Sequence, residues 1–171
     1  MKSHAVSVPR EYPDSQAARR PRAGARGSTA AASTPFVEGY LPALLAQAHD
    51  RIASEFHAVA AEHGVGPSEW RVLATLASGE ATGISRLAQI IVMKQPTVTR
   101  LLDRMQAAGH VQRVPHDGDR RITLVSITER GQQLTDKLVP LALEHEARVL
   151  APFGAEGADA LKLSLRQLIG V

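Results

Sequence analysis

Side chains that could contact nucleic acid gather between positions 94 and 104 of the chain. Amide, hydroxyl and guanidinium groups bond to phosphates and base edges, and one guanidinium can contact a guanine edge at two atoms at once. By this chemistry Gln95 suits adenine and Arg100 suits guanine. The candidates for DNA contact in this stretch are Lys94, Gln95, Pro96, Thr97, Thr99, Arg100 and Arg104.

Apolar periodicity indicates how these side chains are presented. From about Gln95 to Ala108 the apolar residues recur at three- and four-residue steps, which predicts a helix that stops at Gly109. Its apolar arc centres near Met105, so the polar candidates point away from the core. A helix of about 14 residues is roughly 21 Å long and fits the major groove. We expect Asp103 to orient Arg100 from three residues away.

The segment that follows predicts a β-hairpin with arginine at its tip. The runs 110–114 and 122–127 are rich in β-branched residues and flank turn-forming residues at 115–119. Arg120 and Arg121 lie on this exposed turn, where a narrow minor groove would attract guanidinium groups. A solvated surface is the ordinary interpretation of a polar helix face. The arginine-tipped hairpin beside it favours DNA recognition instead.

The remaining apolar periodicity predicts five further helices around this segment. Pro67 suits the first turn of the second helix, Ser85 is a fair N-cap for the third, and Thr128 caps the fifth, which Pro140 is expected to bend. The five are expected at about 41–64, 67–79, 85–91, 129–150 and 156–169. The chain is therefore predicted to be mainly α-helical, with a small β-hairpin wing.

The outer helices carry more apolar surface than a small core can cover. This surplus predicts that residues 40–64 and 129–170 form dimerisation helices around a lobe at 67–128, within a domain spanning 35–171. The alternative is that these helices fold back on their own core.

Charge is divided unevenly along the chain. The net charge is +3, yet residues 1–33 carry +4, residues 86–121 carry +4 and the rest carries −5. The second positive block contains the candidate contacts and adds Arg86 to them. The chain has no cysteine, which excludes thiol redox sensing, and no apolar run long enough for a membrane span. We expect a cytoplasmic protein with no membrane partner.

Residues 1–34 combine Pro, Gly, Ser, Ala and Arg with few large apolar side chains. Such a segment cannot bury enough surface to offset chain entropy, so we expect a disordered basic tail. It could be merely a solvated tail or an arm that contacts phosphates, and its composition also fits an organelle transit peptide, the least favoured option.

One stretch resembles a known family closely. The run LAQIIVMKQPTVTRLLDRMQAAGHVQRVPHDGDRRITLVSITERG at 87–131 resembles the DNA-binding lobe of the MarR family. The shared features are the Leu-Asp-Arg segment at 102–104, the Asp-x-Arg wing at Asp119 and Arg121, and the Ile-Thr-x-x-Gly start of the next helix at 127–131. The resemblance extends from about Tyr40 to Ile169. The long basic tail and the bulky turn at 91–93 depart from the family pattern.

The resemblance implies a dimeric winged helix-turn-helix transcription factor. Members of the family are mostly repressors that bind palindromic operators in double-stranded DNA and release them when a small ligand binds. It assigns recognition to the helix at 95–108 and minor-groove contact to Arg121. It also implies an effector site where the lobe meets the dimerisation helices.

Four residues are candidates for that effector site: His49, His57, Trp70 and Arg71. An indole beside a guanidinium suits an aromatic carboxylate, and the two histidines share one face of the first helix. The simpler interpretation places Trp70 in the core and Arg71 in a surface ion pair. A metal site at His49, His57, His63 and His145 is the weaker alternative because no pair has close ligand spacing, so we expect neither metal nor cofactor.

The function predicted is that of a ligand-responsive repressor. The alternative is a constitutive or architectural DNA-binding protein without an effector. An enzyme is not expected, because no catalytic triad order, phosphate loop or carboxylate pair stands in a recognisable setting.

Overall fold

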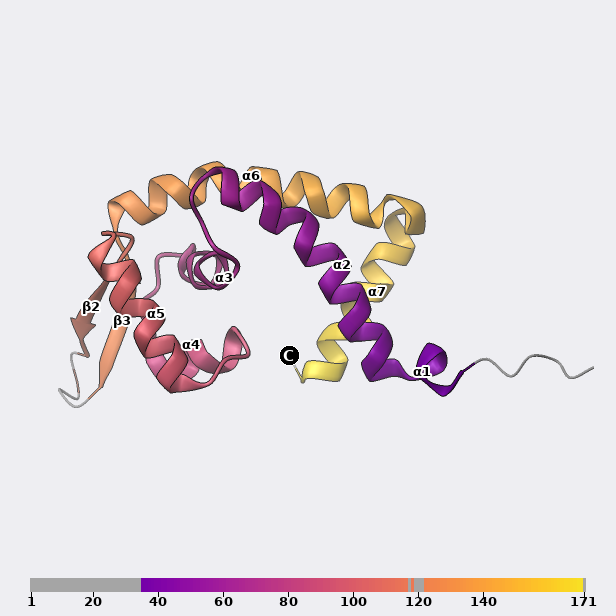
Figure 1. Cartoon of the computed structure of the whole chain (residues 1–171), viewed down its shortest axis with the longest axis horizontal. Helices are drawn as coiled ribbons and strands as arrows, with labels where there is room; N and C mark the ends of the chain where they lie inside the picture. Colours follow the sequence, from indigo (N-terminus) through magenta and orange to yellow (C-terminus); the bar gives the residue numbers. More distant parts are fainter. Residues whose placement is uncertain (1–34, 117, 119–121, 171) are drawn as a thin grey trace, which may run out of the picture. The chain divides into compact units, whose positions relative to one another are not determined.

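The computed structural model describes residues 35–116, 118 and 122–170 (Figure 1). The expectations for the tail at 1–34 and for Arg120 and Arg121 lie outside these residues. The elements run in the order α1 (Phe36–Gly39), α2 (Leu41–Glu62), α3 (Pro67–Leu76), β1 (Thr82–Gly83), α4 (Ile84–Ile90), α5 (Gln95–Ala107), β2 (Val111–Pro115), β3 (Thr123–Ile127), α6 (Glu129–Leu150), the 3-10 turn η1 (Ala151–Phe153) and α7 (Gly154–Ile169). The predicted fold class, mainly helical with a small wing, is confirmed.

The sheet has three antiparallel strands in the order β1-β3-β2. β2 and β3 form the wing hairpin, in register from Val111 opposite Ile127 to Pro115 opposite Thr123. The short β1, which the sequence did not predict, pairs with the far edge of β3. It fixes the chain in an extended form just before α4 and thereby connects the wing to the helix-turn-helix.

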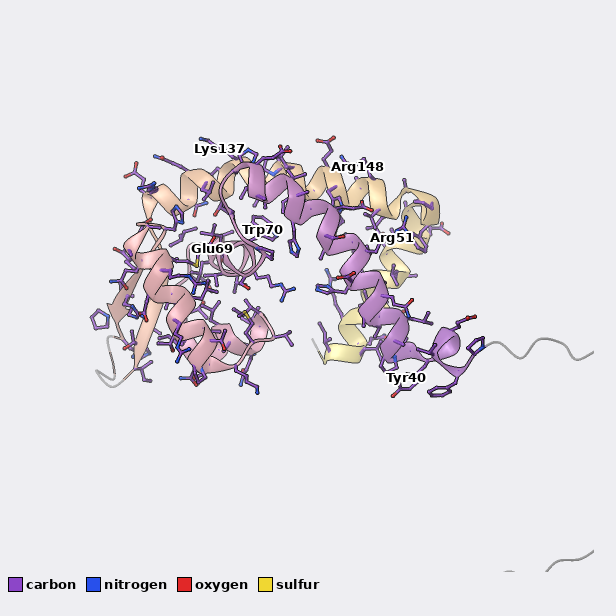
Figure 2. The ribbon with its side chains drawn as sticks, viewed as in Figure 1. Tyr40, Arg51, Glu69, Trp70, Lys137 and Arg148 are labelled. Atoms are coloured by element: carbon purple, nitrogen blue, oxygen red, sulfur yellow. The ribbon has the colours of Figure 1, made fainter. Side chains whose placement is uncertain are left out.

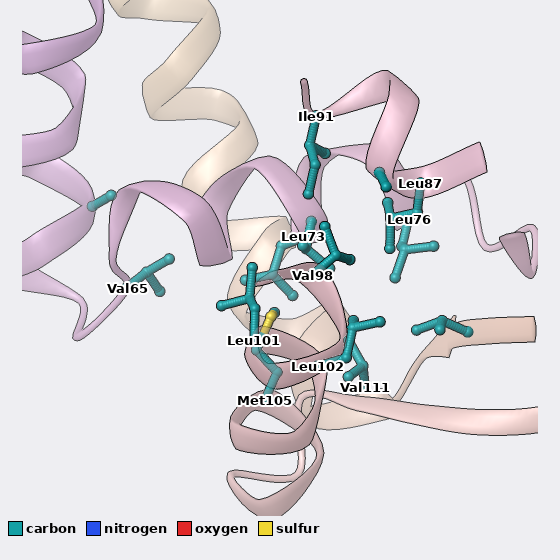
Figure 3. Packing of buried hydrophobic residues seen from close by; sticks show 14 of the residues in the cluster. Val65, Leu73, Leu76, Leu87, Ile91, Val98, Leu101, Leu102, Met105 and Val111 are labelled. Atoms are coloured by element: carbon teal, nitrogen blue, oxygen red, sulfur yellow. The ribbon is translucent and has the colours of Figure 1, made fainter. Parts of the chain in front are cut away.

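The apolar core lies within the segment from α3 to β3 and extends onto α2 and α6. α5 contributes its whole apolar face, and Figure 3 shows these side chains interleaved with those of α3 and α4. The fully buried members on these three helices include Val72, Leu73, Leu76, Leu87, Val98, Leu101, Leu102 and Met105. Packing on this side leaves the opposite face of α5 in solvent.

Two predicted helix ends are confirmed by their backbone geometry. Gly109 follows α5 with φ of 76°, and the N–H groups of Gly109 and His110 bond to the carbonyls of Gln106 and Met105, both at 2.9 Å. This pairing closes a helix through a left-handed residue, for which glycine has no steric penalty. At the start of α6, Thr128 Oγ1 accepts from Gly131 N at 3.1 Å, as expected of an N-cap.

Ser85 is not the N-cap of α4, contrary to the expectation. The cap residue is Gly83, with φ of −64° and ψ of 142°, because pairing with β3 holds residues 82–83 extended and the helix begins directly afterwards. Ser85 therefore lies inside the first turn, where its hydroxyl is free to serve another purpose.

The outer helices expose much of their apolar surface. α7 has no buried residue, and Leu168 and Ile169 at its end are 63% and 72% exposed. Near the start of the described chain, Phe36 and Tyr40 stack with ring centroids 4.9 Å apart and are themselves exposed. Among the described helices, none has the length and apolarity needed to cross a bilayer.

Candidate nucleic-acid interface and effector pocket

α5 presents its polar candidates on the face opposite the core. Lys94 is its N-cap residue and Pro96 lies in the first turn, where the missing N–H costs nothing. The hydroxyl of half-buried Thr99 donates to the Gln95 carbonyl at 3.1 Å, so part of its donor capacity is used within the helix. The residues in solvent are Lys94, Gln95, Pro96, Thr97, Arg100 and Arg104.

Four cations on this side are free to meet an anion. The side chains of Arg86, Lys94, Arg100 and Arg104 are exposed and make no hydrogen bond or ion pair within the part of the chain that the structure describes. A phosphate would therefore not have to displace an existing carboxylate partner. The dipole of α5 adds a partial positive charge at its start, beside Lys94.

Asp103 does not orient Arg100, contrary to the expectation. Its Oδ1 accepts from Nη2 of Arg113 on β2 at 2.6 Å, and Nη1 of the same arginine donates to Gln106 Oε1 at 2.8 Å. Arg113 lies ten residues away in sequence, and the hairpin brings it alongside α5. The pair joins the wing to the recognition helix and leaves Arg100 unrestrained.

Gln95 is positioned by Ser85, which the sequence analysis had expected to be the N-cap of α4. Ser85 Oγ donates to Gln95 Oε1 at 3.2 Å, which holds the amide at the mouth of a hollow of about 500 Å³. The hollow is lined by the starts of α4, α5 and β3, namely Gly83, Ile84, Ser85, Arg86, Gln95, Ile122 and Thr123. It places Arg86 and Gln95 on one concave surface next to the wing.

The structure brings the four effector candidates together. His49, His57, Trp70 and Arg71 all line a hollow of about 260 Å³ between α2, α3 and α6. Arg71 Nη2 donates to His49 Nε2 at 3.1 Å, and Trp70 packs against Phe56 with ring centroids 5.0 Å apart. The hollow thus has a basic end and an aromatic wall.

A larger hollow of about 550 Å³ lies on the other side of the same residues. It shares His49, Trp70 and Arg71, and its far wall is the turn between α4 and α5 at residues 90–92. Figure 2 labels Trp70, which lies on α3. A ligand bound here would touch the turn that precedes the recognition helix.

The histidines of this region differ in environment. Burial lowers the pKa of His57 below its ordinary value of 6.5, and the positive charges of Arg71 and His49 lower it further. His145 on α6 is buried, and its Nε2 lies 3.4 Å from Glu55 Oε2 without the alignment of a hydrogen bond. Within the described ranges, no three His, Asp or Glu side chains gather closely enough to hold a metal ion.

Sequence reasoning did not assign Phe56 and His145 to this site. Phe56 follows His49 by seven residues on α2, so helical spacing alone could have included it. His145 depends on how α6 packs across α2, which no local pattern reveals.

Comparison with known proteins decides the family. A model described as the MarR family matches residues 63–122. The crystal structure of the MarR family transcriptional regulator SPO1453 from Silicibacter pomeroyi DSS-3 is 38% identical, with a TM-score of 0.71, and the match covers 80% of this chain and 98% of that one. The chain belongs to the MarR family. The fold and the family resemblance noted at 87–131 are thereby confirmed.

The curated relatives of this chain are named as transcriptional regulators. The regulator PecS of Dickeya dadantii (strain 3937) is 33% identical over 105 residues, covering 60% of this chain and 61% of PecS. The homoprotocatechuate degradative operon repressor of Escherichia coli is 28% identical over 127 residues, covering 74% of this chain and 86% of the repressor. The matched part therefore spans less than two thirds of PecS.

Proposed function

We propose that the chain is a homodimeric repressor that binds a palindromic operator in double-stranded DNA. In this proposal α5 lies in the major groove, Gln95, Thr97 and Arg100 face base edges, and Arg86, Lys94 and Arg104 face phosphates. The observation that carries it is a group of four cations around the solvent face of α5 that are exposed and have no partner among the residues that the structure describes. Thr99 and Pro96 shape the start of the helix beside them.

The wing completes the proposed DNA interface. Its strands are tied to α5 by Arg113, which contacts both Asp103 and Gln106. We assign Arg120 and Arg121 to the minor groove on the sequence argument alone. A structural neighbour supports the proposal of DNA binding: a mutant MarR from E. coli, at 20% identity with a TM-score of 0.69, was crystallised in complex with operator DNA.

The exposed apolar surface of the outer helices supports the proposed dimer. We assign the DNA-binding lobe to residues 67–128 and the dimer contacts to 40–64 and 129–170. Two recognition helices related by a twofold axis read half-sites about 34 Å apart, which is why a palindrome is expected.

The regulatory ligand is proposed to be a small aromatic acid. Arg71 with His49 offers a basic end for a carboxylate, and Trp70 with Phe56 offers a ring-stacking wall. The E. coli relative is named for a homoprotocatechuate operon, and the NadR structure, with a TM-score of 0.71 and 23% identity, holds 4-hydroxyphenylacetate. A ligand that bridges the lobe and the outer helices would change the spacing of the two recognition helices.

The experiment begins with genomic fragments retained by the purified chain, which should contain an inverted repeat. Fluorescence anisotropy then measures binding of that repeat by three variants. Arg100→Ala should cost about 1–3 kcal/mol and relax preference at particular bases, whereas Arg121→Ala should weaken all sequences and lower the salt slope by about 1. Lys137→Gln, which removes an exposed cation on α6 outside the proposed DNA face, is the matched control in phosphate-free buffer. Wild-type binding by both arginine variants would refute the docking mode.

The ligand is tested separately at fixed salt. A panel of phenolic and other aromatic acids is titrated while Trp70 fluorescence and operator release are followed. Release by an acid, lost in Arg71→Gln, supports the effector proposal. If no acid loosens the complex, the constitutive alternative holds and the DNA-binding proposal stands unaffected.

A further inference from the structure

A separate basic hollow lies where α2 ends, α5 passes into β2 and α6 begins. It has a volume of about 280 Å³ and is lined by His63, His110, Arg130, Gln133, Leu134 and Lys137. Figure 2 shows Lys137 on α6 beside the C-terminal end of α2. None of these residues belongs to the DNA interface or to the effector pocket proposed above.

The hollow is electrically one-sided. Arg130 and Lys137 are exposed, stand two helical turns apart on α6, and make no ion pair within the described part of the chain. Its described lining contains no carboxylate. The carboxylate bonded to a lining residue is that of Glu129, which accepts from the Gln133 amide at 3.5 Å. The lining thus carries two permanent positive charges and two imidazoles.

Helix stability does not explain these cations. Arg130 stands in the first turn of α6, where the helix dipole is already positive and a cation is unfavourable. The helix ends that face the hollow do not need cations as caps either. Carbonyls of α2 already accept from the amides of Gly64 and Val65, and those of α5 accept from Gly109 and His110.

DNA is not the natural occupant. His110 directly precedes β2, whose other end leads to the wing tip, so the hollow lies at the base of the wing and at the C-terminal end of α5. Arg86 and Gln95 lie at the opposite end of α5, beside the distal part of the hairpin. A duplex bound at the proposed face would leave this hollow free.

We infer that the hollow binds the phosphoryl group of a small phosphorylated metabolite. A phosphate monoester carries up to two negative charges and three acceptor oxygens, which match the two cations. Nδ1 of His63 donates to the Val59 carbonyl at 3.1 Å, which leaves Nε2 of the neutral ring as an acceptor for the hydroxyl of a phosphate monoanion. Leu134 gives the carbon portion of the metabolite an apolar contact.

Binding here would connect three elements. His63 ends α2, His110 joins α5 to β2, and Arg130 and Lys137 belong to α6. An anion held by all three ties the lobe to the outer helices, so a phosphorylated metabolite is a second input into DNA binding. The site itself does not depend on the proposed repressor function.

The test uses the full chain at constant ionic strength. Thermal unfolding and calorimetric titration are run with inorganic phosphate, with glycerol phosphate as a simple monoester, and with chloride and acetate. We expect saturable stabilisation by the phosphates, tighter for the monoester. Arg130→Gln and Lys137→Gln should each weaken it about fivefold. The matched control Arg86→Gln, which removes a free cation on the DNA face, should leave it unchanged.

Several results would overturn the inference. Chloride at the same ionic strength could stabilise as well as phosphate, which would indicate a general salt effect. Arg86→Gln could weaken binding as much as Lys137→Gln, which would place the phosphate on the DNA face. Equal affinity for inorganic phosphate and the monoester would refute the assignment to a metabolite. If Arg130→Gln does not fold, Lys137→Gln alone decides.

Discussion

Val92, in the turn before the recognition helix, occupies a backbone conformation that usually holds glycine. Its φ is 54°, and Val92 and Met93 donate to the carbonyls of Gln89 and Ala88, the pairing that closes a helix through a left-handed residue. This region costs an L-residue about 1–2 kcal/mol. The side chain is 85% exposed, so little burial offsets that cost.

Replacing Val92 with glycine should therefore stabilise the fold. After the larger chain entropy of glycine is subtracted, we expect Val92→Gly to raise the free energy of unfolding by about 0.5–1 kcal/mol in urea titrations. Val92→Ala retains a Cβ and should change it little. A less stable Val92→Gly would mean that the valine side chain makes a stabilising contact with the adjoining hollow.

His57 couples stability to pH. The pKa of its imidazole is lowered in the folded protein, first by burial and then by Arg71 and His49. The unfolded chain therefore takes up this proton at a higher pH than the folded one. The stabilising contribution of neutral His57 is full above the ordinary value of 6.5 and is lost as the pH falls through it towards the folded pKa.

His57→Gln, which cannot take up that proton, should flatten the loss of stability between about pH 7 and pH 5. Urea midpoints measured across this range check the slope. His63→Gln removes a histidine from the exposed end of the same helix and should leave the slope as in the wild type. Parallel curves for wild type and His57→Gln would show that His57 does not control this pH dependence.

At the scale of elements, the junction of α5, the wing and α6 depends on two adjacent contacts. Thr128 Oγ1 donates to the Gly109 carbonyl at 2.6 Å while it caps α6. Gly131, one turn into α6, is buried so closely against His110 that a Cβ there would collide with the His110 carbonyl oxygen. The threonine and the glycine of the Ile-Thr-x-x-Gly motif are thus explained by the cap of α6 and by its close packing against His110.

Gly131→Ala should force the start of α6 away from the wing. We expect a loss of about 1–3 kcal/mol of stability, measured by urea unfolding, together with weaker operator binding. Gly39→Ala is the control, because a Cβ at Gly39 would meet nothing within 4 Å. Equal stability of the two variants would contradict the tight packing described here.

Local rules predicted the elements better than their connections. The bounds of α5, the glycine that ends it and the cap at Thr128 all follow from spacing within a few residues. The sequence predicted a pair between Asp103 and Arg100 because spacing reveals only neighbours on the same helix. The actual partner is Arg113, which the fold of the hairpin brings next to Asp103. The Ser85 cap failed similarly, since pairing between β1 and β3 moves the start of α4.

The effector pocket shows the same limit. The histidine spacing on α2 and the Trp70-Arg71 pair predicted four of its lining residues. The remaining walls, from the turn at 90–92 and from Ala142 and His145 on α6, arise only when α2, α3 and α6 pack together. Periodicity within one helix carries no information about which other helix will cover it.

For the whole molecule, exposed apolar side chains make dimerisation the central expectation. Most of them belong to α1, α2, η1 and α7, including Phe36, Leu41, Leu44, Phe153, Leu163, Leu168 and Ile169. A monomer would leave all of them in water, at about 25 cal/mol for each Å² of apolar surface. In the proposed dimer, burial against a second copy would remove this cost and set the distance between the two recognition helices.

Charge placed on α7 should therefore separate the protomers. Leu168→Glu combined with Ile169→Glu would bury two carboxylates from each protomer in the dimer, so we expect a monomer by sedimentation at micromolar concentration. Because each recognition helix then binds one half-site independently, operator affinity should fall about 100-fold or more. Val92→Glu places a carboxylate on an exposed apolar position outside the outer helices and should sediment like the wild type.

If the charged α7 variant remained dimeric, the dimer contact would have to lie on elements other than α7. A monomer that kept full operator affinity would instead break the link between dimer geometry and half-site spacing.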